Sequence, residues 1–227
     1  MRVLVVVTSH SVLGSRGTPT GYYLPEVTHP YAALANRGIE VDIASPKGGE
    51  APLDRNSVKL DDPITRQLWE TPEFRRALQN TLKLDEVDAS QYSGVVFAGG
   101  HGTMWDFRTD PGVQRVTREV WENNGVVGAV CHGPAALVDV KLSNGKYLVD
   151  GKTVSAFTDE EEEAAGLTKI VPFLLASELK TRGAKHTFAP LWRSHVVADG
   201  RLVTGQNPAS AKGVGEKVAE ILANRSE

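Results

Sequence analysis

An apolar run in the middle of the chain ends abruptly at a cysteine, the only one among 227 residues. Residues 126–130 are typical of a buried strand, and Cys131, His132 and Gly133 interrupt them just before Pro134, which the first turn of a helix tolerates. This strand–turn–helix order predicts a nucleophile elbow, with the thiol facing the free N–H groups of the following helix. A free cysteine is often only a small core residue, but the helix and the adjacent imidazole predict a thiol of lowered pKa.

Strand-like and helix-like segments alternate along the rest of the chain, which is the pattern of a parallel sheet covered by helices. The predicted strands are residues 2–7, 40–44, 94–98, 126–130, 153–156 and 202–204. The predicted helices are residues 25–37, 112–123, 134–140, 171–182 and 209–224. Residues 46–92 interrupt the alternation with a helix-prone body at 64–84, so we expect a cap insertion there within a single α/β domain of residues 1–227.

The composition favours an enzyme over a protein that binds nucleic acid or a membrane. A net charge of −3 leaves no basic surplus for nucleic acid, and the apolar run at residues 3–7 is too short to span a membrane. One cysteine cannot form an intrachain disulfide, so the cytoplasm is the expected location.

Three segments are predicted to meet beyond the carboxyl ends of the strands, where doubly wound sheets bind ligands. The glycine turn after strand 94–98 holds Gly100 and His101, and its backbone N–H groups suit an oxyanion hole together with the His132 N–H. Glu26 occupies the first turn of the helix after the first strand, a place where a carboxylate also serves the helix dipole alone.

Two further sets of polar residues have simpler explanations. The histidines at positions 10, 29 and 101 lack the spacing and companion carboxylates that specify zinc, so we expect them to line a pocket or support the structure without a metal. The acidic run at residues 160–163 is typical, for the most part, of a solvated helix start.

Four motifs spread over the chain carry a family resemblance: GGHGTMWDF, AVCHGPAAL, GKTVSAFTDEEE and DGRLVTGQNPAS. Together they resemble the ThiJ/PfpI superfamily of class I glutamine amidotransferase-like proteins, and its heat-shock-type glyoxalase III branch in particular. The resemblance implies a flavodoxin-like three-layer sandwich with a parallel central sheet and a small helical cap, commonly assembled as a homodimer.

The same resemblance assigns roles to individual residues. It implies that Cys131 is the nucleophile, His132 its neighbouring histidine, Glu162 the carboxylate that orients this histidine, and Glu26 the proton shuttle. Glu26 also keeps the ExxHP context of the family. The residues expected on the oxyanion and substrate-binding side of the site are Gly100, His132, His101 and His29.

The resemblance implies a glutathione-independent glyoxalase, a lyase that converts methylglyoxal or a related 2-oxoaldehyde into a 2-hydroxy acid. A hemithioacetal on Cys131 replaces the glutathione adduct, Glu26 is the expected base with His132 as its alternative or partner, and no cofactor is needed. Amide transfer is disfavoured because Ala129 replaces the first glycine of a GxCxG elbow. The alternatives are a stress-related holdase chaperone, a protein deglycase, a redox-sensing cysteine protein and, less favoured, a cysteine peptidase.

Overall fold

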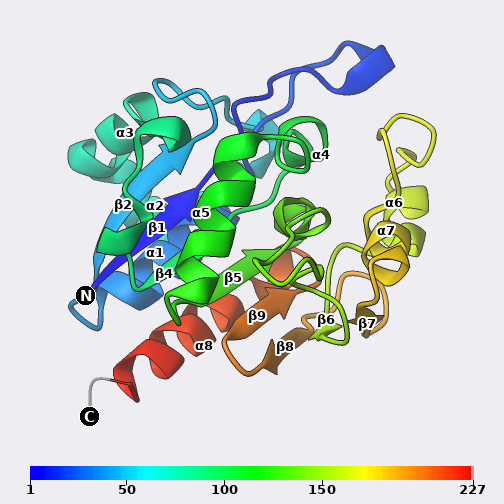
Figure 1. Cartoon of the computed structure of the whole chain (residues 1–227). Coiled ribbons are helices and arrows are strands. Elements are labelled where there is room, and N and C mark those ends of the chain that lie inside the picture. The colour runs from blue at the N-terminus through cyan, green and yellow to red at the C-terminus, as the bar shows by residue number, and fades with distance from the viewer. Residues whose placement is uncertain (226–227) are drawn as a thin grey trace.

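The computed structural model describes residues 1–225 and places a seven-stranded sheet at the centre, with helices on both faces (Figure 1). The strand order is β3-β2-β1-β4-β5-β9-β8, and every neighbouring pair is parallel except β8 and β9. The strands are β1 (Arg2–Val6), β2 (Glu40–Ser45), β3 (Leu82–Lys83), β4 (Gly94–Phe97), β5 (Val126–Val130), β8 (Val196–Asp199) and β9 (Leu202–Gly205). The predicted α/β sandwich with a parallel central sheet is confirmed.

The central strands are buried on both faces, which explains why they are apolar without alternation. In β1, Leu4 and Val6 belong to one core cluster, whereas Val3 and Val5 belong to the other. The helix on the first side is α5 (Pro111–Glu122), and those on the second are α1 (Pro25–Ala35) and α8 (Ala211–Ala223). The carboxyl ends of β1, β4 and β5 meet at one edge of the sheet, where the elbow lies.

Two predictions for the second half of the chain are wrong. Residues 153–156 contribute only β6 (Thr153–Val154), which pairs with β7 (Lys185–His186) in a separate two-stranded sheet because β9 already occupies the place beside β5. The segment after the cysteine is a 3₁₀ helix, η5 (Gly133–Leu137), instead of an α-helix. Such a short segment cannot build the helix dipole on which the predicted thiol pKa depends.

The remaining short helices lie in connections. They are α4 (Thr103–Asp106), α6 (Asp159–Ala164) and α7 (Leu175–Thr181), with the 3₁₀ helices η1 (Gly14–Arg16) and η6 (Pro208–Ser210). Figure 1 shows α6, α7, β6 and β7 grouped beyond the β9 side of the sheet. None of the helices within residues 1–225 is long and apolar enough to cross a membrane.

The predicted insertion at residues 46–92 contains helices and one edge strand. Its helices are α2 (Pro63–Glu70) and α3 (Pro72–Gln79), with the 3₁₀ helices η2 (Arg55–Ser57), η3 (Leu84–Glu86) and η4 (Ala89–Gln91). β3 returns the chain to the main sheet beside β2, and η3 and η4 contact α5. The insertion is therefore attached to the sheet at its far end.

A polar chain joins the insertion to α1. Asp62 caps α2 by accepting from the Ile64 N–H at 3.2 Å, and its other oxygen accepts from Thr65 at 2.6 Å and lies 2.6 Å from His29 Nε2. The Thr65 hydroxyl is 2.8 Å from that of Thr28. Because Thr28 and His29 belong to α1, this chain fixes α2 against the helix that carries Glu26.

Asp62→Ala should lower the free energy of unfolding by about 2 kcal/mol, because it removes a helix N-cap and leaves His29 without its partner. Urea denaturation followed by circular dichroism measures the loss. Asp61→Ala is the matched control: Asp61 is exposed and has no side-chain partner within residues 1–225, so its loss should stay below about 0.5 kcal/mol. Equal losses of unfolding free energy in the two variants would show that the hydrogen bonds of Asp62 do not stabilise the fold.

Candidate active site

Cys131 occupies a strained turn directly after β5. Its φ is +60°, in the left-handed region that a non-glycine residue seldom adopts. The backbone is held in place because the Cys131 N–H donates to the Gly205 carbonyl at 2.9 Å and the Cys131 carbonyl accepts from the Phe157 N–H at 2.9 Å. A Cβ on Gly133 would lie 2.2 Å from the Phe97 carbonyl, so only glycine fits there. The predicted elbow is therefore present.

Glu26 lies against the cysteine in a fully buried position. A Cβ on Gly99 would lie 2.1 Å from the Glu26 carboxylate and 3.0 Å from Cys131 Cβ, so the glycine makes room for both side chains. Burial raises the pKa of Glu26 to about 8, although the Cys131 thiol and the Gly99 N–H work in the opposite direction. Neither interaction is aligned as a good hydrogen bond, since within residues 1–225 both carboxylate oxygens lack a partner.

The same burial acts on the thiol. Burial and then the Glu26 carboxylate raise the pKa of Cys131, and only the His132 N–H opposes them. This is the opposite of the lowered thiol pKa that the elbow predicts. The reason is that the sulfur is buried, that the Glu26 carboxylate lies beside it, and that η5 replaces the expected α-helix.

His132 is fixed by a buried carboxylate. Its Nδ1 lies 3.4 Å from Cys131 Sγ, and its Nε2 lies 2.7 Å from Glu162 Oε2. Burial, and next His101, lower the pKa of His132, so the ring is neutral, donates from Nε2 and leaves Nδ1 as an acceptor toward the thiol. Although burial opposes it, His132 lowers the pKa of Glu162, with His101 contributing. The carboxylate is therefore ionised.

His101 completes this group from the glycine turn after β4. Its Nε2 lies 2.7 Å from Glu162 Oε1, and its ring centroid is 4.1 Å from that of His132. The donor atoms of the two histidines and Glu162 all lie within 4.8 Å of one another, a grouping that also meets the spatial requirement for a metal. Here the nitrogens point at the two carboxylate oxygens, which satisfies them as charge-assisted hydrogen bonds.

The glycine turn is built to approach the elbow closely. Gly100 has a φ of +107°, and a Cβ there would lie 2.2 Å from the Gly21 carbonyl. The buried Thr103 hydroxyl lies 2.9 Å from the Gly100 carbonyl and 3.0 Å from the His132 carbonyl, so it ties the turn to the elbow. The turn and the elbow therefore keep a fixed separation.

His29 does not join this group. Its partner is Asp62, in the polar chain between α1 and α2, and its Nδ1 is buried without a partner within residues 1–225. The ExxHP context therefore marks the attachment of the insertion to α1. The structure brings together Cys131, His132, Glu26, Glu162, His101 and Gly100, and it places His29 in a different contact.

Sequence reasoning missed an aromatic and acidic support around His132. The Phe157 ring lies 4.2 Å from His132 and 5.7 Å from Trp192, whose φ is +65° and whose side chain is half exposed. The Trp192 N–H donates to Glu161 Oε1 at 2.9 Å, and the side-chain amides of Gln206 and Asn207 donate to the same oxygen at 2.9 Å.

The acidic run 160–163 is accordingly only partly solvated, because Glu161 and Glu162 are both buried. The capping box of Thr158 with Glu161 was the one sequence signal that could have placed Glu161 inside.

Known proteins are similar to this chain in sequence and in fold. A profile of the DJ-1/PfpI family matches residues 18–221. The glutathione-independent glyoxalase HSP31 of Saccharomyces cerevisiae is 34% identical over 237 residues, covering 98% of this chain and 98% of that protein. Among solved structures, glyoxalase III from Candida albicans has a TM-score of 0.90 at 31% identity over 97% of both chains. Rapid Encystment Protein 24 kDa of Francisella tularensis has a TM-score of 0.94 at 39% identity, over 97% of this chain and 98% of that one.

Glu26→Gln should change how stability depends on pH. A carboxyl whose pKa is raised on folding keeps its proton longer in the folded state, so wild-type stability falls as the pH rises from 4.5 to about 8 and is level above that. Relative to Glu26→Gln, we expect the wild type to lose roughly 1–4 kcal/mol across this range. Urea denaturation at a series of pH values measures the difference.

The Cys131→Ala variant controls for the thiol. It should keep the wild-type slope, because the raised pKa of the thiol lies above this pH range. Parallel pH profiles for wild type and Glu26→Gln would mean that Glu26 titrates near its ordinary value.

Proposed function

The chain belongs to the DJ-1/PfpI family, and on this basis we propose that it is a glutathione-independent glyoxalase acting on methylglyoxal or related 2-oxoaldehydes. The full-length similarity to proteins named as glutathione-independent glyoxalases supports this assignment. The observation that carries it is the contact of a buried thiol with a buried carboxyl whose pKa is near neutrality. Such a pair suits a reaction in which a nucleophile adds to a carbon atom and an acid–base group then moves the proton of that same carbon.

The first step is addition of the thiol to the aldehyde. The Cys131 sulfur attacks C1 while its proton passes to the Glu26 carboxylate, which relieves the like charges that raise the thiol pKa. The aldehyde oxygen becomes an alkoxide beside the N–H groups of Gly100 and His132, which act as the oxyanion donors. Protonation of this oxygen by Glu26 gives the hemithioacetal and returns Glu26 to its ionised form.

The second step moves a proton from C1 to C2. Glu26, now a carboxylate, removes the C1 proton, and the electron pair forms an enediol as the C2 carbonyl oxygen takes up a proton. Glu26 then returns the carbon-bound proton to C2 while the C1 hydroxyl gives up its own proton, which balances the proton taken up by the C2 oxygen. A thioester remains at C1 and a hydroxyl at C2. Water then cleaves the thioester to the 2-hydroxy acid and restores the Cys131 thiol. The net change is one 2-oxoaldehyde plus one water to one 2-hydroxy acid.

His132, held by Glu162, supports both steps. Its neutral Nδ1 faces the sulfur, so it accepts the thiol proton when Glu26 is protonated and delivers water to the thioester as a general base. Glu162 and His101 are positioning residues in this scheme, because they set the ring orientation without reaching the sulfur.

Three finer assignments belong to the same proposal. The enzyme is a lyase, because the reverse reaction removes water from a 2-hydroxy acid. It works in the cytoplasm, because a reducing compartment keeps the thiol on which the reaction depends. It is a homodimer, as the family resemblance implies, which analytical ultracentrifugation tests directly.

Purified wild type should form lactate from methylglyoxal without glutathione, and Cys131→Ala should form none. Glu26→Gln should lower kcat by about 100-fold to 10,000-fold, the usual contribution of a general acid or base, while an aldehyde adduct accumulates on Cys131. Lactate formation gives kcat, and mass spectrometry of the Cys131 peptide detects the adduct. Glu163→Gln, on the exposed side of α6, is the matched control and should keep wild-type turnover.

Lactate formation by Cys131→Ala at the wild-type rate would rule out the covalent route. A Glu26→Gln variant within about threefold of wild type would assign the proton transfer to His132 instead.

Trp192 should influence which 2-oxoaldehyde is preferred, because its ring extends the aromatic surface of Phe157 away from His132. Trp192→Asn removes the ring while keeping a residue that tolerates positive φ. We expect kcat/KM for phenylglyoxal to fall about threefold to tenfold more than kcat/KM for methylglyoxal. Phe188→Ala is the control from the same loop, since Phe188 stacks on His186. An unchanged ratio in Trp192→Asn would exclude a contact with the substrate.

A further inference from the structure

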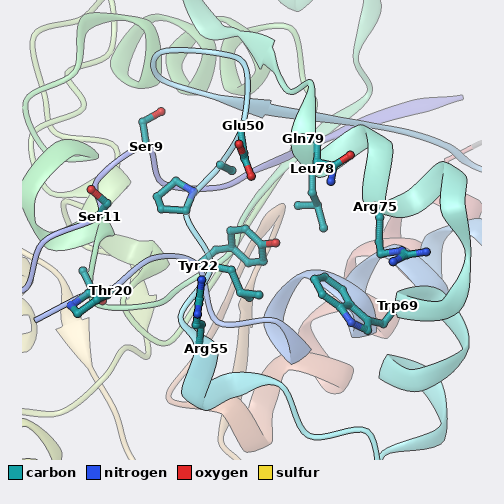
Figure 2. A pocket seen from close by; sticks show the side chains of 14 residues that line it. Ser9, Ser11, Thr20, Tyr22, Glu50, Arg55, Trp69, Arg75, Leu78 and Gln79 are labelled. Carbon is teal, nitrogen blue, oxygen red and sulfur yellow. The ribbon is translucent and has the colours of Figure 1, made fainter.

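A cavity separate from the cysteine lies between the segments that follow β1 and β2 and the helices of the insertion (Figure 2). Its volume is about 610 Å³, within the range of small-molecule sites. The lining contains neither Cys131 nor Glu26. The side chains that give the cavity its chemical character are Tyr22, Glu50, Arg55, Trp69, Arg75 and Leu78.

Two guanidinium groups in this cavity have no carboxylate partner. Neither Arg55 nor Arg75 forms an ion pair within residues 1–225. By contrast, Arg76, the next residue along α3, pairs with Glu73 at 2.7 Å and does not line the cavity. Free arginine side chains at a cavity suit carboxylate groups, which they bind with two parallel hydrogen bonds.

Tyr22 supplies a hydroxyl at the wall of the same space. The residue is only 2% exposed, yet its hydroxyl has no hydrogen-bond partner within residues 1–225. Burial, and then the Glu50 carboxylate, raise the pKa of this phenol, so it is a donor at neutral pH. Figure 2 shows the hydroxyl turned toward the side of the cavity that Trp69 and Leu78 form. The hydroxyl oxygen is accessible at the cavity wall, so a ligand there can accept its proton in place of water.

The apolar part of the lining is flat and lies beside the charged part. Trp69 and Leu78 come from α2 and α3 and face the Tyr22 ring across the cavity (Figure 2). An aromatic ring and an arginine in the lining of one cavity suit a ligand that is planar at one end and anionic at the other. Glu50 is the one acidic group of the lining and suits an N–H on the planar part.

We propose that this cavity binds an aromatic carboxylate. The ligand's carboxylate meets Arg75 and the Tyr22 hydroxyl, and its ring lies against Trp69 and Leu78, whereas Arg55 lies on the opposite side of Tyr22 and adds only positive charge (Figure 2). The volume exceeds what a three-carbon 2-oxoaldehyde would fill, so the cavity suits a larger ligand.

The cavity shares a wall with the cysteine without opening onto it. Tyr22 lines the cavity, whereas Tyr23 lies on the catalytic side, where burial and then Glu26 and Cys131 raise the pKa of its phenol. The Tyr23 N–H donates to the Gly99 carbonyl at 3.1 Å, and the Tyr22 N–H donates to the Pro52 carbonyl at 2.8 Å. The segment that forms the wall is thus held by backbone hydrogen bonds on both sides. Ligand binding in the cavity does not require a free Cys131.

Isothermal titration calorimetry with indole-3-acetate tests the proposal. We expect a Kd of about 10 µM to 1 mM for wild type. Indole-3-acetamide has the same ring without the charge, and it should bind about threefold to thirtyfold more weakly. Added salt should weaken binding of the acid and leave the amide unaffected.

Variants locate the site. Arg75→Gln should weaken binding of the acid about threefold to tenfold, as should Tyr22→Phe, which keeps the ring and removes the donor. Arg76→Gln, one position along the same helix, should bind like wild type, and so should Cys131→Ala, which separates this cavity from the catalytic site. No binding by wild type, equal affinity for acid and amide, or equal losses in Arg75→Gln and Arg76→Gln would each overturn the proposal.

Discussion

The burial of Glu26 against Cys131 is the constraint on which the rest of the site depends. A carboxyl with no exposed surface is hard to ionise, and the thiol beside it is harder still while the carboxyl is charged. The two groups therefore titrate as a pair. The absence of a side chain at Gly99 and the left-handed turn at Cys131 keep the pair in contact. A buried carboxyl beside a buried thiol and a non-glycine residue at positive φ each lower stability, and such costs are typical of functional sites.

Two consecutive glutamates in α6 hold the surroundings of that pair in place. Glu162 turns toward His132 and His101, whereas Glu161 turns the other way and binds the loop that carries Trp192. Because Glu161 also closes the capping box of α6, the start of this helix fixes the direction of both carboxylates. A shift of the helix by one residue would put Glu161 or Glu163 in the place of Glu162. The orientation of this six-residue helix thus sets the position of the His132 imidazole.

Local patterns predicted the central strands and the elbow, because an unbroken apolar run that ends at glycine or cysteine is typical of a buried parallel strand followed by a tight turn. The family resemblance, not local pattern, suggested that Glu26 and Glu162 approach Cys131. The predictions for residues 153–156 and for His29 were wrong because they depended on contacts between distant segments. β9 occupies the place beside β5 in the main sheet, and Asp62 binds His29. The predicted direction of the thiol pKa shift was also wrong, because that pKa depends on burial of the sulfur by segments far apart in the sequence.

The attachment of the insertion limits how the molecule can admit a reactant. β3 is hydrogen-bonded into the main sheet, η3 and η4 rest on α5, and the Asp62 chain joins α2 to α1. Movement of the whole insertion as a lid would break backbone pairing in the sheet as well as side-chain contacts. Passage to the sulfur must therefore rely on smaller displacements, and the half-exposed Trp192 is a large side chain near the site that solvent reaches. Rotation of an exposed side chain takes picoseconds to nanoseconds, much less time than domain closure.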